Sequence, residues 1–210
     1  MPINISTSAV IFRWRPAAWL RVTGADAASF LQGQFTNDLR PLVQQNTRAV
    51  YGLWLSLKGK VLADSFVLRG AAPNEFWIGS YFSSAAVICE RLESHVIADD
   101  VVIQDVTAEW AGVSVIGDGA AKLLEGVSHV SGLAFPGRRE RGENVEWLHP
   151  VAQGEPAWIT GAGLTPVDAD EIARRRIAVG IPAIPADIGP ADLPTEAGLD
   201  ADAISFTKGC

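Results

Sequence analysis

Short runs of apolar and β-branched residues, separated by Gly, Pro and polar residues, recur along most of the chain. Runs of this kind are typical of strands in antiparallel sheets. They predict strands at residues 9–14, 19–23, 50–57, 61–68, 76–78, 101–106, 112–116, 130–135, around Trp147 and at 158–160. The first two should form a hairpin-like start. The clearest hairpin is the one around Lys58-Gly59-Lys60, because Gly59 can supply the positive φ of a tight turn.

Apolar residues at helical spacing occur in fewer places. They predict helices at residues 27–32, 83–95, 119–125 and 168–180. Asp26 is a suitable N-cap for the first helix, and Asp168 or Asp170 for the last. Strand-rich units with one helix in each predict an α+β protein, with ferredoxin-like antiparallel sheets that carry helices on one face.

The 210 residues suffice for one large domain or two small ones. We expect a discontinuous first domain of residues 1–48 and 166–210, and a ferredoxin-like domain of residues 49–165. A net charge of -7 argues against a nucleic-acid-binding surface. Two cysteines and three scattered histidines predict neither a disulfide framework nor a metal site. Without a leader pattern or a long apolar span, a cytoplasmic protein with no membrane partner is expected.

Two polar regions stand out. Residues 136–144 are the most charged stretch, and their mixed signs predict a solvated turn. A polar corner follows the first helix and consists of Gln32, Gln34, Thr36, Asn37 and Asp38. Its donors and acceptors suit a polar heterocycle at a domain junction, whereas Asn37 and Asp38 are equally suited to capping and turning the chain.

Several motifs occur in an order that is typical of one family. They are FLQGQFTND at residues 30–38, LKGKVL at 57–62, RIAVGIP at 176–182, LPTEAGL at 193–199 and ISFTKGC at 204–210. Together they resemble YgfZ-type folate-binding proteins, which are relatives of the glycine-cleavage T protein (an aminomethyltransferase) and of mitochondrial iron–sulfur assembly factors. Lys208, Gly209 and Cys210 match the first three positions of that family's K-G-C-Y-x-G-Q-E motif. The resemblance implies a T-protein-like fold that holds tetrahydrofolate or a derivative, here without the C-terminal β-barrel.

The same resemblance implies roles for particular residues. The polar corner would contact folate, Trp54 would stack on the pterin, and Lys58 and Lys60 would bind the glutamate tail. Arg176 matches the family's arginine, and Cys210 would be a redox or cluster-contact thiol. Three of these roles have a structural alternative. Trp54 would be a core residue, Lys58 and Lys60 would belong to an ordinary hairpin turn, and Cys210 would lie at a frayed chain end.

The implied function is that of a folate-binding accessory protein for iron–sulfur cluster assembly or repair, which affects tRNA-modifying iron–sulfur enzymes. Its partners would be iron–sulfur client or assembly proteins, and an apolar edge left by the absent barrel would favour self-association. One alternative is a one-carbon (aminomethyl) transferase. Residues 83–89 carry no carboxylate where aminomethyltransferases have an aspartate, which favours a non-enzymatic role. A second alternative is a truncated paralogue without ligand, because Ala178 stands where many relatives have a glutamate.

Overall fold

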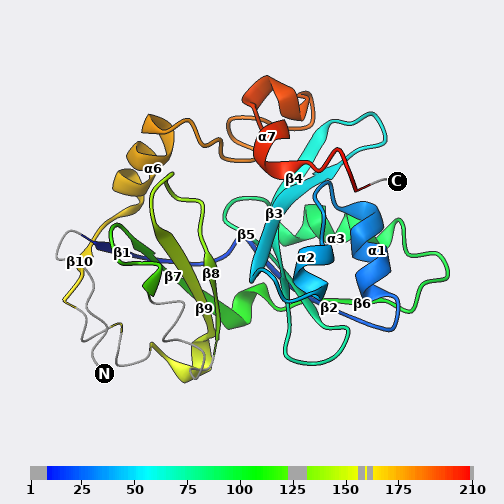
Figure 1. The fold of residues 1–210 in the computed structure, drawn as a ribbon, viewed down its shortest axis with the longest axis horizontal. Coiled ribbons are helices and arrows are strands. Elements are labelled where there is room, and N and C mark those ends of the chain that lie inside the picture. Colours follow the sequence, from blue (N-terminus) through cyan, green and yellow to red (C-terminus); the bar gives the residue numbers. More distant parts are fainter. Residues whose placement is uncertain (1–8, 123–131, 156–158, 160–162, 209–210) are drawn as a thin grey trace. The chain divides into compact units, whose positions relative to one another are not determined.

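The computed structural model describes residues 9–122, 132–155, 159 and 163–208 (Figure 1). Contacts divide the chain into two compact units, each made of segments that lie far apart in the sequence. Unit 1 comprises Met1–Arg15 and Glu109–Ile181, and unit 2 comprises Pro16–Ala108 and Pro182–Cys210. Each unit contains a five-stranded sheet.

The sheet of unit 2 is antiparallel throughout. Its strands, in spatial order, are β3 (Ala49–Leu55), β4 (Val61–Arg69), β5 (Phe76–Ser80), β2 (Ala18–Thr23) and β6 (Val102–Asp105). The turn between β3 and β4 places Gly59 at a φ of 73°, which a residue with a side chain adopts only with strain. The hairpin predicted at this glycine is therefore confirmed.

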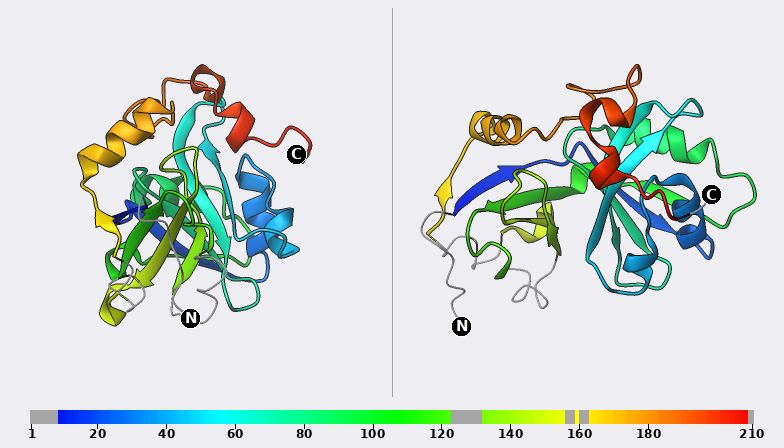
Figure 2. Two further views of the ribbon diagram at one scale, coloured as in Figure 1. Left: turned by 60° about the vertical axis from the view of Figure 1, so that its left-hand side comes forward. Right: turned by 45° about the horizontal axis from the view of Figure 1, so that its top comes forward.

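The two faces of this sheet are covered differently. Three helices pack on one face, around Leu31, Trp54 and Ile88: α1 (Ala27–Gln34), α2 (Arg40–Val43) and α3 (Ala85–Glu93). The other face packs on residues 184–204, which include a 3₁₀ turn (Pro194–Ala197) and α7 (Asp200–Ala203). Both views in Figure 2 show α7 beside the β3–β4 hairpin. The sheet of unit 2 is thus covered on one face by helices from the N-terminal half of the chain and on the other by the C-terminal segment.

Unit 1 is built on a second sheet. Its strands, in spatial order, are β10 (Thr165–Pro166), β1 (Val10–Trp14), β7 (Trp110–Ile116), β9 (Asn144–Pro150) and β8 (Leu133–Pro136). The pairing of β10 with β1 is parallel and the others are antiparallel. Helix α6 (Ala169–Ala178) begins after Asp168, whose Oδ1 accepts the Glu171 N–H at 2.8 Å, so this predicted N-cap is confirmed.

The α+β class with antiparallel sheets is confirmed, whereas the hairpin-like start is wrong. Strand β1 pairs with β7 and β10 in unit 1, while β2 pairs with β5 and β6 in unit 2. The compact units also differ from the expected domains 1–48 plus 166–210 and 49–165, because the chain passes from unit 1 to unit 2 near Pro16, back to unit 1 near Glu109 and to unit 2 again near Pro182. The expected helix at 119–125 and the expected strands at 130–135 and 158–160 lie partly outside the described residues.

Asp26 does not cap α1 through its side chain. Its carboxylate instead accepts the Asp100 N–H at 2.9 Å, and the Asp100 carboxylate accepts the Ala25 N–H at 3.1 Å. The two aspartates therefore tie the start of α1 to the loop before β6. This reciprocal contact depends on a partner 74 residues away and was not visible in the local pattern.

Candidate functional site

Gln32 and Asp38 form one half of the polar corner. The Gln32 amide donates to Asp38 Oδ1 at 3.1 Å and accepts the Leu39 N–H at 2.7 Å. Asp38 also accepts Arg40 Nη2 at 2.7 Å, and this hydrogen-bonded guanidinium lowers the pKa of the Asp38 carboxyl to about 2. These contacts match the chain-turning interpretation of the corner.

Thr36 and Asn37 form the other half and bind the free edge of β3. Thr36 Oγ1 accepts the Leu53 N–H at 2.7 Å and donates to the Ala203 carbonyl at 2.6 Å. Asn37 Nδ2 donates to the carbonyls of Tyr51 at 2.9 Å and Asp202 at 3.2 Å. Both side chains therefore join an edge strand to the C-terminal segment, and these polar groups are already used within the protein.

Gln34 faces a different neighbour. Its Oε1 accepts Arg91 Nη1 of α3 at 3.0 Å, and Arg91 Nε donates to the Leu55 carbonyl at 2.8 Å. Burial lowers the pKa of Arg91. Lys208 lies at the end of α1, where its ammonium donates to the carbonyls of Gln32, at 2.6 Å, and Phe35. A cation at this position satisfies carbonyls that the helix leaves open.

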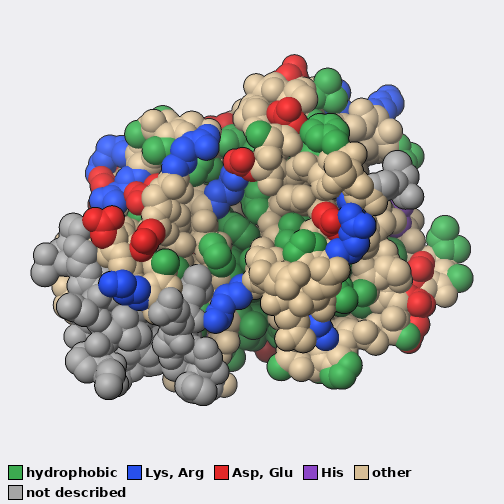
Figure 3. All heavy atoms as spheres, in the orientation of Figure 1, with side chains coloured by type: hydrophobic (Ala, Val, Ile, Leu, Met, Phe, Trp, Pro, Cys, Tyr) green, Lys and Arg blue, Asp and Glu red, His purple; other side chains and the backbone are tan. Residues whose placement is uncertain are grey.

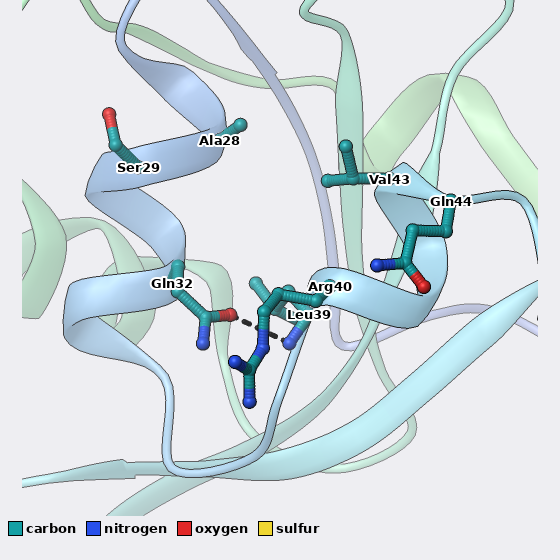
Figure 4. A pocket seen from close by; sticks show the side chains of 7 residues that line it. All are labelled: Ala28, Ser29, Gln32, Leu39, Arg40, Val43 and Gln44. Atoms are coloured by element: carbon teal, nitrogen blue, oxygen red, sulfur yellow. Dashed lines mark hydrogen bonds between the residues drawn. The ribbon is translucent and has the colours of Figure 1, made fainter. Parts of the chain in front are cut away.

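A pocket of about 250 Å³ opens between α1 and α2, beside this corner (Figure 4). It is lined by Ala28, Ser29, Gln32, Leu39, Arg40, Val43 and Gln44. The close-up shows the Gln32 amide turned toward the Leu39 nitrogen, which is the hydrogen bond described above. Because Gln32 and Arg40 are held by Leu39 and Asp38, the most polar side chains of the pocket already have partners.

Trp54 lies in the core beneath the corner. Its side chain is fully buried, its ring centroid is 4.7 Å from that of Phe35, and its indole N–H donates to Ser65 Oγ at 2.7 Å. These contacts are those of the core alternative, and stacking on a pterin would require the indole to leave them.

Lys58 and Lys60 lie in the turn of the β3–β4 hairpin. The turn is closed by backbone hydrogen bonds from Gly59 to Ser56 and from Ser56 to Lys60, both at 2.9 Å. Neither lysine forms an ion pair with any residue that the structure describes. Their ammonium groups are thus the cations of the predicted set that are best placed to take an external carboxylate.

Arg176 belongs to unit 1, whereas the other predicted ligands belong to unit 2. Its Nη1 donates to the Ile181 carbonyl at 2.6 Å, just beyond the end of α6. The neighbouring Arg174 and Arg175 both donate to Glu171, at 2.9 and 2.7 Å. Figure 3 accordingly shows basic and acidic side chains intermixed around α6. The arginine triplet therefore has carboxylate and carbonyl partners of its own.

Of the two cysteines, only Cys89 lies among the described residues. Cys210, predicted as the reactive thiol, lies outside the described residues. Cys89 on α3 is half-buried and free, and burial, with smaller contributions from Glu93 and Asp105, raises the pKa of its thiol to about 11. Such a thiol is protonated near neutral pH, which agrees with a structural Cys89.

The solvated turn predicted at residues 136–144 is partly wrong. Arg139 is buried, with its Nε 3.2 Å from Ser114 Oγ and 3.4 Å from Glu146 Oε1. Its guanidinium also lies 4.6 Å from the ring centre of Trp14. Charged residues next to one another in the sequence thus separate into one that is buried and others that face solvent, because β9 presents a buried carboxylate to Arg139.

Asp64 is the buried polar site that the motifs did not reveal. It lies on β4, opposite Leu53, and only 4% of the residue is exposed. Its carboxylate accepts three hydroxyl groups: Ser83 at 2.6 Å, Ser80 at 2.9 Å and Tyr51 at 3.0 Å. Burial raises the pKa of the carboxyl, against these hydrogen bonds, which lower it. A usable signal was present, since Asp64 is the one carboxylate in the apolar run 61–68.

Neither a metal cluster nor a membrane span is found in the described part of the chain. No three His, Cys, Asp or Glu side chains there are grouped so that they could hold a metal ion. No helix among these residues is both long and apolar enough to cross a bilayer.

Comparison with known proteins places these features in a family. The family described as "GCVT N-terminal domain" matches residues 4–141. The "Iron-sulfur cluster assembly factor IBA57, mitochondrial" of Homo sapiens is 30% identical over 95% of this chain, and the protein of the same name from Mus musculus is 29% identical over the same share. The chain spans 59% of the length of each relative.

A solved structure shares the fold. Glycine cleavage system aminomethyltransferase T from Bartonella henselae matches 95% of this chain and 58% of its own, with a TM-score of 0.78 at 15% identity. This likeness shows the T-protein fold, and no closed barrel is found among the described residues. Because the family match covers more than half of the chain, this protein belongs to the GCVT N-terminal domain family.

Proposed function

We propose that this protein is an accessory factor for the assembly or repair of iron–sulfur clusters. The observation that carries the proposal is the similarity, over 95% of the chain, to two relatives that are named as iron–sulfur cluster assembly factors. Its partners would then be iron–sulfur client or assembly proteins, with the cluster as cargo. Enzymes that modify tRNA and carry such clusters are among the clients that the family resemblance implies.

A depletion experiment in the encoding organism tests this role. Loss of the protein should lower the activity of iron–sulfur enzymes and leave flavin enzymes without clusters unchanged. Restoring the wild-type chain should restore the activity, and Cys210→Ser should restore less if the thiol contacts the cluster. Cys89→Ser is the matched control, because the half-buried Cys89 is expected to be structural. Unchanged iron–sulfur enzyme activity after depletion would contradict the proposal.

We further propose that the protein binds a tetrahydrofolate derivative, with the glutamate tail on Lys58 and Lys60. Two ammonium groups on one hairpin turn suit a tail that carries carboxylates. The side chains of Thr36, Asn37 and Trp54 fit such a ligand less well, because their polar atoms already bind backbone or core groups. The hairpin lysines are therefore the residues with which the test begins.

Calorimetric titration with 5-formyltetrahydrofolate measures this binding. We expect a dissociation constant in the micromolar range, which corresponds to about -8 kcal/mol. Lys58→Ala combined with Lys60→Ala should weaken binding by about tenfold, since two charge-assisted contacts are lost. Arg176→Ala tests the family's arginine in the same assay.

Lys122→Ala serves as the matched control, because Lys122 is an exposed lysine of unit 1. It should bind like the wild type. Absence of binding at millimolar folate would exclude the folate proposal and leave the assembly role, which is tested separately, standing.

A further inference from the structure

The hydroxyl group of Ser83 has one proton and two acceptors within reach. Its Oγ lies 2.6 Å from Asp64 Oδ1 and 3.2 Å from the carbonyl oxygen of Ile184. It also accepts the backbone N–H of Asp64 at 3.0 Å. Because a hydroxyl donates only one hydrogen bond, Ser83 can satisfy either the carboxylate or the carbonyl, but not both.

The other two hydroxyl groups also donate to Asp64, Ser80 to the same Oδ1 and Tyr51 to Oδ2. Ser80 Oγ accepts the N–H groups of Ser83, at 3.0 Å, and Phe82, at 3.3 Å, so its proton points to Asp64. Tyr51 donates to Asp64 Oδ2 at 3.0 Å. Ser83 is therefore the partner that links Asp64 to the Ile184 carbonyl.

Ile184 lies at the start of the segment that covers this face of the sheet. Its side chain is fully buried with Leu53 and Val61, and Ser83 is the donor found for its carbonyl within the described chain. Farther along, the Asp192 carbonyl accepts the Val61 N–H at 3.1 Å. A buried carbonyl that loses its donor is costly, so this contact affects how firmly residues 182–203 are attached.

We propose that Asp64 and Ser83 form a proton-linked latch for residues 182–203. When Asp64 is neutral, its carboxyl O–H donates to Ser83 Oγ, and the Ser83 proton holds the Ile184 carbonyl. When Asp64 releases its proton to solvent, the charged carboxylate takes the Ser83 proton, and the Ile184 carbonyl is left without its donor. Ionisation of one buried side chain thus loosens a distant segment of the same unit.

No charged side chain that the structure describes is paired with Asp64, so the pH dependence proposed here is assigned to the Asp64 carboxyl. Burial raises its pKa, and it has no ion pair with a described Lys, Arg or His. Tyr51 of β3 is the titratable group in contact with it. In the covering segment, the exposed Asp187 carboxylate accepts the Ala183 N–H at 2.8 Å, and on α3 the guanidinium of Arg91 is bound to the Leu55 carbonyl.

Hydrogen exchange between pH 5 and pH 9, corrected for the intrinsic exchange rate, tests the latch. In the wild type, protection of residues 182–203 should fall by about fivefold as pH rises, the factor expected for one lost hydrogen bond. Asp64→Asn should remove the pH dependence of this protection, because its side chain cannot ionise. Ser83→Ala should give low protection at every pH.

Tyr51→Phe distinguishes the latch from a general effect of pH. It removes a donor that favours the ionised carboxyl, so the midpoint of the change should move to higher pH. Strand β9 of unit 1 is the internal control and should not follow the same midpoint. Protection of residues 182–203 that does not vary with pH in the wild type, or that varies equally in Asp64→Asn, would overturn the proposal.

Discussion

Asp64 in unit 2 and Glu146 in unit 1 are both carboxylates buried in a β-sheet, and their charges are compensated differently. Glu146 accepts Ser114 Oγ at 2.6 Å and has the Arg139 guanidinium at 3.4 Å. Asp64 accepts Ser83 Oγ at the same 2.6 Å, with hydroxyls as its only side-chain partners among the described residues. The difference teaches that a shared serine contact does not decide how the charge of a buried carboxylate is compensated; the presence of a cation does.

The largest effect should come from removing that cation. Arg139→Met leaves Glu146 buried without its counter-charge and should lower the free energy of unfolding by about 3–5 kcal/mol. Urea denaturation measures the loss. Adding Glu146→Gln should recover much of it, because the uncompensated charge is then gone. If the single variant Arg139→Met and the double variant Arg139→Met/Glu146→Gln were equally stable, Arg139 would act mainly through its contacts with Phe12 and Trp14.

Removing the serine from each site sharpens the comparison. Ser83→Ala should cost about 1–3 kcal/mol, because Asp64 has no cation to compensate and the Ile184 carbonyl also loses its donor. Ser114→Ala should cost about 1 kcal/mol, since Arg139 still faces Glu146. Both are measured by urea denaturation at the same pH. A larger loss for Ser114→Ala would reverse the interpretation of the two sites.

The stability that Asp64 contributes should depend on pH. The pKa of Asp64 is raised above its ordinary value of 3.8, so the neutral carboxyl stabilises the fold at low pH. That contribution is lost as pH rises from about 3.8 through the raised pKa. The stability of Asp64→Asn relative to the wild type should therefore increase with pH and then level off. A difference in the free energy of unfolding between Asp64→Asn and the wild type that stays constant from pH 4 to pH 9 would contradict a raised pKa of Asp64.

The smallest effect is expected where the charge pair is exposed. Arg40→Ala breaks the bidentate contact with Asp38 and returns the pKa of that carboxyl from about 2 toward 3.8. The pair stabilises the fold above pH 3.8, and this contribution is lost as pH falls toward 2. Because water screens the pair, its removal should change the urea midpoint at neutral pH no more than the error of the measurement.

Some of the candidate site could be predicted because its signals are local. The Gly59 turn and the Asp168 N-cap each depend on residues within a few positions, and both are confirmed. The sequence is compatible with Asn37 and Asp38 as either ligands or turn residues. The structure gives them turn and edge contacts, but Asn37 also binds Asp202, 165 residues later, which no local pattern contains.

Arg139 and Asp64 show what sequence patterns could not assign. The mixed charges around Arg139 are typical of a solvated turn, and only the pairing of β8 with β9 brings Glu146 beside it. The lone carboxylate in the apolar strand 61–68 marked Asp64 as unusual. Its three hydroxyl partners come from β3, β5 and the loop before α3, so the chemistry of the site followed only from their assembly.

The sequence by itself determined the α+β class, the β3–β4 hairpin, the cap of α6 and the family, because each depends on short-range spacing or on contiguous motifs. The tertiary structure alone decided which sheet each of the first two strands joins, and that Thr36 binds the C-terminal segment. It also decided which buried carboxylate has a cation. Pairing between distant segments is selected by the total burial and hydrogen bonding of a whole unit, which no short window of sequence contains.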